Sequence, residues 1–165
     1  MGAMLRAGAS TAVLVAVYYV LPLDRINGWA AAAILVLGLA ALAGLVTFQV
    51  RSIIGSRFPA LRGIQALATS VPLFLLLFAS TYVVLATMSA GNFSQPLTRT
   101  DALYFTVTVF ATVGFGDITA TTQVARLVVT GQMIADLIII GIAAKVIVGA
   151  VQRGRAQRPP AGTAG

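Results

Sequence analysis

The sequence predicts an all-α membrane protein with four transmembrane helices and a short helix that re-enters the membrane between the third and the fourth. Of its 165 residues, 59% are hydrophobic and only 9% are charged. The mean hydropathy of +0.97 lies far outside the range of soluble domains. Four apolar stretches approach or exceed the length of about 20 residues that a membrane-spanning helix needs. A fifth helical pattern is too short to cross.

The four predicted spans cover residues 7–23, 28–50, 64–88 and 124–151. The first is the shortest, and Arg6 stands just ahead of it, so a cleaved secretory signal is the alternative. We favour a retained span because no small-x-small cleavage site precedes Pro22 and Asp24. This span and the second form an N-terminal unit over residues 1–50. Their many small residues, and the lack of an arginine at every third position, favour helices that brace the rest over a charged sensor.

Positive charge sets the expected orientation. The chain has 11 Lys and Arg against 4 acidic residues, a net charge of +7. Most of the excess flanks the spans, which indicates membrane topology and contact with anionic lipids, and no nucleic-acid partner is needed to explain it. By the positive-inside rule both termini are cytoplasmic, because the arginine clusters fall between spans two and three and after span four: Arg51, Arg57, Arg62, Arg153, Arg155 and Arg158. On the outer side, Tyr18, Tyr19 and Trp29 fit an interfacial aromatic belt around a turn at residues 24–27.

Two segments outside the spans have their own composition. Residues 51–63 mix arginines with apolar residues and fit a cytoplasmic linker in the membrane interface, where Pro59 would interrupt a long helix. Residues 152–165 contain little to bury and are expected to form a disordered cytoplasmic tail. Residues 64–151 then form one module of two spans and the short helix.

The supply of reactive side chains argues against an enzyme. The chain has no cysteine and no histidine, and all four acidic residues are aspartates. Disulfides, thiol chemistry and Cys-based metal sites are therefore impossible, and residues for general acid–base catalysis are nearly absent. We expect no enzymatic activity and no cofactor.

The segment between spans three and four carries the most specific pattern. Residues 89–100 form a polar loop, and Thr100 and Asp101 resemble an N-cap and a first-turn acid of a helix over residues 101–111. Because this helix cannot span the bilayer, it must re-enter and return. The residues after it, 112–117, must then be non-helical backbone that is buried in protein or lines water.

The sequence Thr112-Val113-Gly114-Phe115-Gly116-Asp117, placed after a short aromatic-rich helix, resembles the selectivity filter of the potassium channel family. In that family, rings of backbone carbonyls replace the hydration shell of the ion. The resemblance covers about residues 64–151 and implies K⁺ coordination by the carbonyls of residues 112–115 and by the Thr112 hydroxyl. Gly114 and Gly116 would adopt conformations that a side chain disfavours. Phe115 replaces the more usual tyrosine, so filter stability is expected to differ more than selectivity.

The resemblance also implies a homotetramer, because each chain holds one pore loop and the filter needs four. The third span is then the outer helix and the fourth the inner helix. One stripe of the inner helix is assigned to the cavity and cytoplasmic constriction, with ordinary lipid or interhelical packing as the alternative: Met133, Leu137, Ile140, Ala144 and Val148. Asp117 belongs to the outer mouth, either bonded back to the short helix or as part of a ring that concentrates cations.

Asp136 and Lys145 are the charged residues inside the last span. Asp136 stands near the cavity stripe, where relatives commonly have a hinge glycine. It forms either an acidic ring below the filter or a hydrogen bond to Thr108 or Gln132, and the sequence leaves both open. Lys145 is close enough to the cytoplasmic end to extend to the lipid headgroups.

The expected function is passive, selective conduction of K⁺ across the plasma membrane of the cell. Two alternatives remain open. One is a weakly selective monovalent cation channel, since a filter of the same composition can still be loose. The other is a four-helix membrane scaffold subunit that conducts no ions.

Overall fold

The computed structural model describes residues 2–20 and 59–156, together with residues 29–30, 33, 36–38, 40–41, 43–44 and 47–48. The named elements are α1 (Gly2–Val20), α3 (Pro59–Met88), the 3₁₀ turn η2 (Ala90–Asn92), α4 (Arg99–Phe110) and α5 (Gln123–Ala156). In the described part of the chain these helices are joined by loops, and the only strand-like pairing there is one isolated bridge between Phe93 and Ala120.

Two helices in the described part are long and apolar enough to cross a membrane: Ala66–Met88 within α3 and Gln123–Lys145 within α5. They correspond to the third and fourth predicted spans. The first predicted span lies in α1, whose apolar part, Thr11–Val20, is shorter. In the second, the described residues between 29 and 48 are helical, and the remainder lies outside the described residues, as do the turn at residues 24–27 and the linker residues 51–58.

Both long helices extend beyond the predicted boundaries. α3 begins at Pro59, so residues 59–63 of the predicted linker are helical. Proline at the first position of a helix loses no hydrogen bond and has a suitable φ, and Pro59 therefore starts this helix where we expected it to interrupt one. α5 continues to Ala156, so residues 152–156 of the predicted tail are also helical. The remaining tail residues, 157–165, are outside the described residues.

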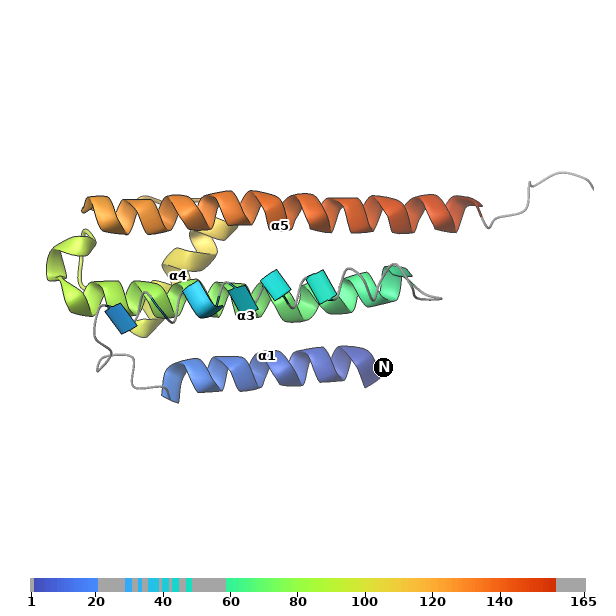
Figure 1. Ribbon diagram of the computed structural model, residues 1–165, viewed down its shortest axis with the longest axis horizontal. Helices are drawn as coiled ribbons and strands as arrows, with labels where there is room; N and C mark the ends of the chain where they lie inside the picture. The colour runs from blue at the N-terminus through green and yellow to red at the C-terminus, as the bar shows by residue number, and fades with distance from the viewer. Residues whose placement is uncertain are drawn as a thin grey trace, which may run out of the picture.

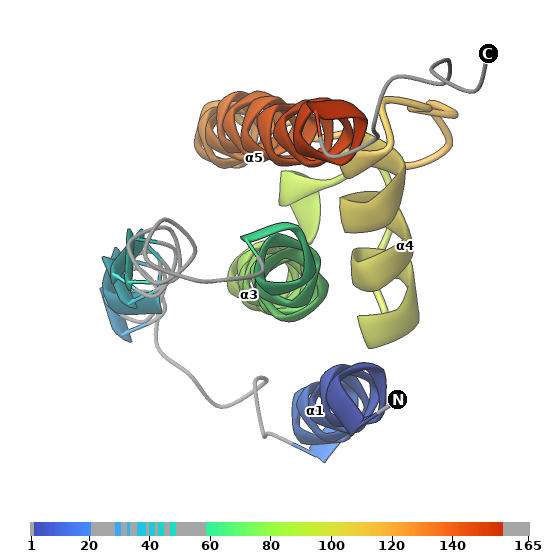
Figure 2. The ribbon, with the colours of Figure 1, turned by 90° about the vertical axis from the view of Figure 1, so that its right-hand side faces the viewer.

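α3 is the central helix of the structure. Viewed along the helices, α1 and α5 lie on opposite sides of it, while α4 closes a third side (Figure 2). α3 packs against all three of these helices, and α4 also packs against α5. α1, α3 and α5 run along the length of the molecule, and α4 is inclined to them (Figure 1). The start of α1, the start of α3 and the end of α5 share one end of the molecule (Figure 1).

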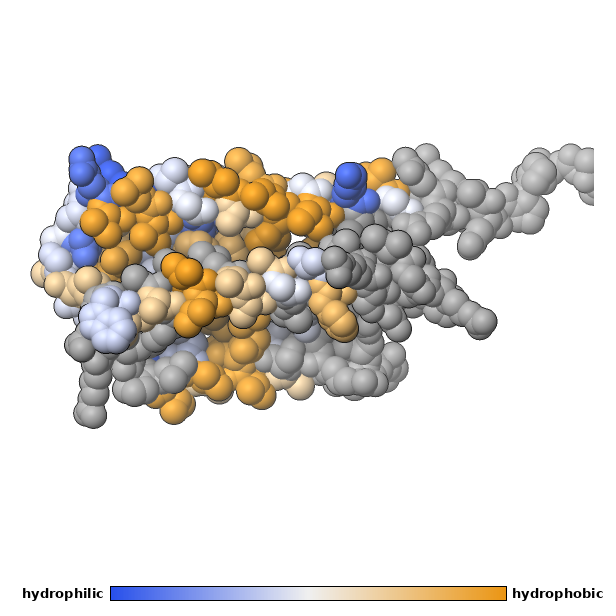
Figure 3. All heavy atoms as spheres, viewed as in Figure 1, coloured by the Kyte–Doolittle hydropathy of each residue, from blue (hydrophilic) through white to orange (hydrophobic). Residues whose placement is uncertain are grey.

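The surface follows the same axis. Apolar side chains cover much of the visible length of α5, and hydrophilic residues gather at the end where α5 begins (Figure 3). Large aliphatic side chains on α5 remain exposed in the single chain, among them Leu127, Ile134 and Ile138. An apolar surface of this extent is stable only in lipid or against another protein surface.

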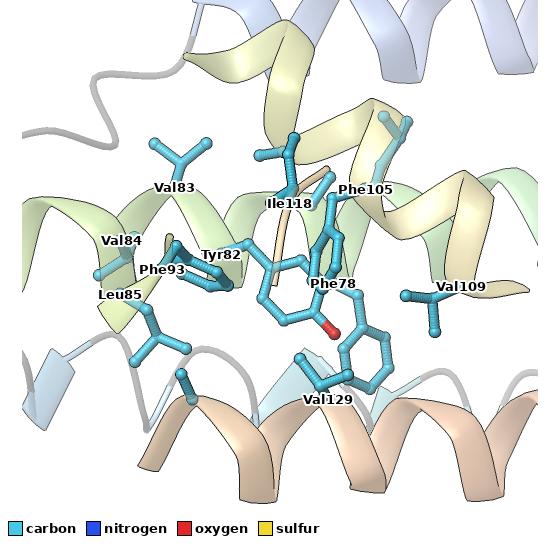
Figure 4. Close-up of a cluster of buried hydrophobic side chains, with 14 of the residues drawn as sticks. Phe78, Tyr82, Val83, Val84, Leu85, Phe93, Phe105, Val109, Ile118 and Val129 are labelled. Carbon is cyan, nitrogen blue, oxygen red and sulfur yellow. The ribbon is translucent and has the colours of Figure 1, made fainter. Parts of the chain in front are cut away.

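Aromatic side chains fill the core between α3, α4 and α5 (Figure 4). The Tyr82 ring of α3 lies edge-on to Phe105 of α4, with ring centroids 5.2 Å apart, and to Phe93 of the following loop, 5.8 Å apart. Such pairs contribute about 0.5–1.5 kcal/mol each beyond the burial of their area. The cluster therefore fixes the inclined helix α4 against α3.

Candidate functional site

The N-cap of the short helix α4 (Arg99–Phe110) lies two residues before the predicted one. Thr98 is the N-cap, and it forms a capping box with Asp101 at the third helical position. The Asp101 amide donates to the Thr98 hydroxyl oxygen (3.2 Å), and the Thr98 amide donates to the Asp101 carboxylate (2.9 Å). Thr100, the predicted N-cap, instead lies inside the helix. A threonine with an acid three residues later matches the capping-box pattern, and this spacing distinguishes Thr98 from Thr100.

Residues 112–117, the candidate filter, are attached directly to the last turn of α4. The Thr112 amide donates to the Val109 carbonyl oxygen (2.9 Å). The amides of Val113 and Gly114 both donate to the Thr108 carbonyl oxygen, at 3.0 and 3.2 Å. These bonds use carbonyls that a helix end leaves open. They also hold the start of the candidate filter next to the negative end of the α4 dipole.

The backbone of the candidate filter alternates in handedness. Thr112, Gly114 and Gly116 have positive φ angles of 56°, 51° and 80°. Val113 and Phe115, between them, do not have positive φ. Alternating right- and left-handed conformations turn successive amides toward one side of the chain and successive carbonyls toward the other. Gly114 and Gly116 thus have the positive φ that we expected of them. Thr112 also has a positive φ, which the sequence did not suggest because a β-branched residue rarely adopts it.

The carbonyl oxygens on the other side are available to a ligand. Within the described part of the chain, no hydrogen bond reaches the carbonyl oxygens of residues 112–116. All of these residues are exposed in the single chain. Four consecutive carbonyls, those of residues 112–115, are therefore in a position to bind a cation.

The segment that follows the candidate filter is bound to the loop after α3. The Ser94 amide donates to the Thr119 carbonyl oxygen (2.9 Å), and the Thr119 amide donates back to the Ser94 hydroxyl (3.0 Å). Asn92 accepts from the Thr121 amide through its backbone carbonyl (3.0 Å) and from the Thr122 hydroxyl through its side chain (2.7 Å). The candidate filter is thus fixed at both ends, by α4 before it and by residues 91–94 after it.

An aromatic contact supports the second half of the candidate filter. The Phe115 ring lies parallel to the Tyr104 ring of α4, with centroids 6.3 Å apart and an angle of 6° between the planes. Desolvation raises the pKa of the Tyr104 phenol, and the nearby Asp117 carboxyl raises it further. The Asp117 carboxyl thus lies near Tyr104 of α4.

Behind the candidate filter, a buried polar network joins three helices. The Tyr82 hydroxyl of α3 donates to the Gln132 side-chain oxygen of α5 (2.6 Å). The Gln132 amide nitrogen donates to the Thr106 carbonyl oxygen of α4 (3.1 Å) and to the Asp136 carboxylate (3.3 Å). Within the described part of the chain, the other Asp136 carboxylate oxygen has no partner.

The predicted cavity residues separate into two groups. All residues of the predicted stripe are exposed in the single chain: Met133, Leu137, Ile140, Ala144 and Val148. Asp136 is instead 2% exposed and faces α3 and α4 through the network. Lys145 is exposed near the far end of α5. The structure brings Asp136 together with Gln132, and not with Thr108, whose hydroxyl donates to the Phe105 carbonyl of its own helix.

Three important side chains were not identified from the sequence. In the sequence, Tyr82 is one of many apolar residues in the third predicted span. Arg99 belongs to the predicted polar loop over residues 89–100. Tyr18 was assigned to the interfacial belt, but it is 2% exposed, and its hydroxyl donates to the Arg99 carbonyl oxygen (2.7 Å). The available signal was chemical: a tyrosine buried in a membrane protein needs a hydrogen-bond partner.

Comparison with known proteins identifies a family for the region that contains this site. Residues 70–153, which include α4, the candidate filter and most of α3 and α5, match a family model described as an ion channel. No curated protein and no solved structure matches the chain. The matched region spans half of the chain and begins within α3, so α1 is not part of it. The chain belongs to the ion channel family of the two-helix potassium-channel pore type, and it is a membrane protein.

Proposed function

We propose that this chain forms a homotetrameric potassium channel in which the carbonyls of residues 112–115 and the Thr112 hydroxyl coordinate dehydrated K⁺. The observation that carries this proposal is the alternating backbone of the candidate filter, with positive φ at Thr112, Gly114 and Gly116. Its carbonyl oxygens accept no hydrogen bond within the described part of the chain. Rings of such carbonyls substitute for the hydration shell of a cation.

Assembly around an axis supplies what one chain lacks. The carbonyls of one chain contact an ion from one side only. Four chains related by cyclic symmetry surround the ion with carbonyls. In that arrangement one exposed stripe of α5 lines the cavity and its cytoplasmic constriction: Met133, Leu137, Ile140, Ala144 and Val148. Asp136 serves as an interhelical link, because its carboxylate is buried in the Gln132 network. Asp117 supports the outer mouth through Tyr104.

The proposed orientation has both termini in the cytoplasm and the loop around η2 outside, in the plasma membrane. All four predicted spans cross the bilayer in this arrangement. The start of α1 and the end of α5 share one end of the molecule (Figure 1), as this orientation requires. The arginines near the ends of α3 and α5 then contact anionic headgroups.

A liposome flux assay tests the proposal. The full chain is reconstituted, and ion flux is measured with K⁺, Na⁺ and Ba²⁺, alongside the variant Thr112→Cys. We expect K⁺ flux, little Na⁺ flux and block by Ba²⁺, whose radius is close to that of K⁺. Loss of the coordinating hydroxyl in Thr112→Cys reduces or corrupts selectivity while the chain remains in the membrane.

The other outcomes identify the alternatives. A reversal potential that does not follow the K⁺ gradient against Na⁺ would indicate a weakly selective cation channel. A stable monomer or dimer without ion flux would indicate a non-conducting scaffold. Wild-type K⁺ selectivity in Thr112→Cys would show that the filter lies elsewhere.

A further inference from the structure

α1 lies outside the residues matched to the ion channel family, yet its last turn is bound to the first turn of α4. The Arg99 guanidinium donates to the carbonyl oxygens of Tyr18 (2.7 Å) and Tyr19 (2.9 Å). In return, the Tyr18 hydroxyl donates to the Arg99 carbonyl oxygen (2.7 Å). The Tyr19 and Thr100 hydroxyls share a further hydrogen bond of 3.1 Å. These four bonds, the α1–α4 clamp, join residues about 80 positions apart in the sequence.

The clamp satisfies groups that α1 leaves open. The last four carbonyls of a helix have no partner within it, and a cation near that end is favourable. Arg99 supplies both the donors and the charge to the end of α1. At the first position of α4, however, the same charge faces the positive end of the α4 dipole. The charge of Arg99 therefore destabilises α4 alone but stabilises the contact between α1 and α4. This indicates that Arg99 joins the two helices.

Tyr18 anchors the clamp inside the protein. It is 2% exposed and belongs to the same hydrophobic cluster as Phe74 and Phe78 of α3. The edge of its ring meets the Tyr19 ring, with centroids 5.2 Å apart. A buried phenol without a partner is costly, so its bond to the Arg99 carbonyl is held firmly. The start of α4 is thereby fixed relative to α1 and α3 together.

The other end of α4 carries the candidate filter. α4 has 12 residues, a length of about 18 Å, and the Thr108 carbonyl in its last turns holds the amides of Val113 and Gly114. A helix this short moves as a rigid unit, so a shift at its start tilts its end. We infer that α1 positions the filter through this clamp, and that Tyr18 and Arg99 are positioning residues for ion conduction.

This inference rests on the proposed function, and its test is separable from it. The variants are Tyr18→Phe, which keeps the buried ring and removes the donor, and Arg99→Met, which removes the guanidinium. Arg126→Gln is the matched control: Arg126 is exposed at the same end of the molecule and donates to the Ala120 carbonyl (3.1 Å), not to α1. Arg99→Lys retains a charged donor and is expected to restore part of the wild-type behaviour.

Hydrogen exchange is measured on the reconstituted full-length chain, in a peptide containing residues 112–114, whose amides bond to α4. K⁺ currents in planar bilayers give the open probability. We expect exchange about fivefold faster or more in Tyr18→Phe and Arg99→Met, with a lower open probability and unchanged conductance of each open channel. The double variant should resemble the worse single variant, since both act through one contact. Arg126→Gln should match the wild type.

Wild-type exchange in both clamp variants would overturn the inference, whatever the currents show. Equal effects in Arg126→Gln would also overturn it, because surface charge alone would then explain them. Absence of K⁺ current in the wild type would reject the proposed function, and the exchange measurement would still decide on the clamp. If Arg99→Met fails to fold, Tyr18→Phe decides, since it removes a single oxygen atom.

Discussion

The side-chain amide of Gln132 donates a 3.1 Å hydrogen bond to the carbonyl oxygen of Thr106. Through this bond α5 holds α4 two residues before Thr108, whose carbonyl oxygen accepts hydrogen bonds from the candidate filter. The Tyr82 hydroxyl fixes the Gln132 side chain from the opposite side, at 2.6 Å. Gln132 and Tyr82 are fully buried, so each polar atom depends on these partners.

The variant Tyr82→Phe tests this interlock. It keeps the aromatic packing and leaves the Gln132 side-chain oxygen without its donor, which we expect to cost about 1–3 kcal/mol of stability. Ser80→Ala is the control, because its hydroxyl donates only to Leu76 in the same helix. Thermal unfolding of the assembled protein in detergent measures both. Equal midpoints for Tyr82→Phe and the wild type would mean that the network adds nothing.

Gly114→Ala tests the backbone of the candidate filter. An added Cβ at Gly114 would meet nothing within 4 Å in the single chain, and the expected defect comes from its φ of +51°. The strain costs about 1–2 kcal/mol and should reduce or corrupt K⁺-selective flux. Gly131→Ala on α5 also has open space around the added methyl group, and no positive φ. Flux in that control should equal that of the wild type. Equal, selective flux in Gly114→Ala would contradict the assignment of residues 112–116.

Asp136→Asn separates the two roles of the buried acid. Asparagine keeps the size and an acceptor for Gln132 and removes the charge. As Asp136 is an interhelical link in our proposal, we expect unchanged outward conductance and unchanged block by internal Mg²⁺. Asp136→Leu leaves one Gln132 amide hydrogen without an acceptor, and the tetramer should lose about 1–3 kcal/mol. Weaker internal block in Asp136→Asn would instead indicate an acidic ring in the cavity.

The cap of α4 predicts a dependence on pH. The hydrogen bond from the Thr98 hydroxyl, followed by that from its amide, holds the pKa of Asp101 below its usual value of 3.8. A group whose pKa is lowered by folding contributes stability above its unfolded pKa and loses it as the pH falls through the folded pKa. We expect thermal stability to decline below pH 3.8, and Asp101→Asn to weaken that decline. An identical pH profile for wild type and variant would show that the cap does not couple to stability.

The sequence alone determined the local features. Hydropathy and length identify α3 and α5, and the spacing of Gly114 and Gly116 identifies a backbone with unusual conformations, because these properties depend on neighbouring residues only. Positive φ at both glycines confirmed that expectation. The helix boundaries were less exact. Residues 59–63 and 152–156 proved helical, since a helix continues past the apolar pattern wherever no residue stops it.

The tertiary structure decided which face of each apolar helix meets protein. In a membrane helix nearly every face is apolar, so periodicity does not separate the core side from the lipid side. For this reason the sequence left Asp136 between two roles and placed Tyr18 in the interfacial belt. Their partners, Gln132 for Asp136 and Arg99 for Tyr18, follow from packing: the Tyr18–Arg99 bond joins residues 81 positions apart. Such pairs exist only after α1, α4 and α5 have packed around α3.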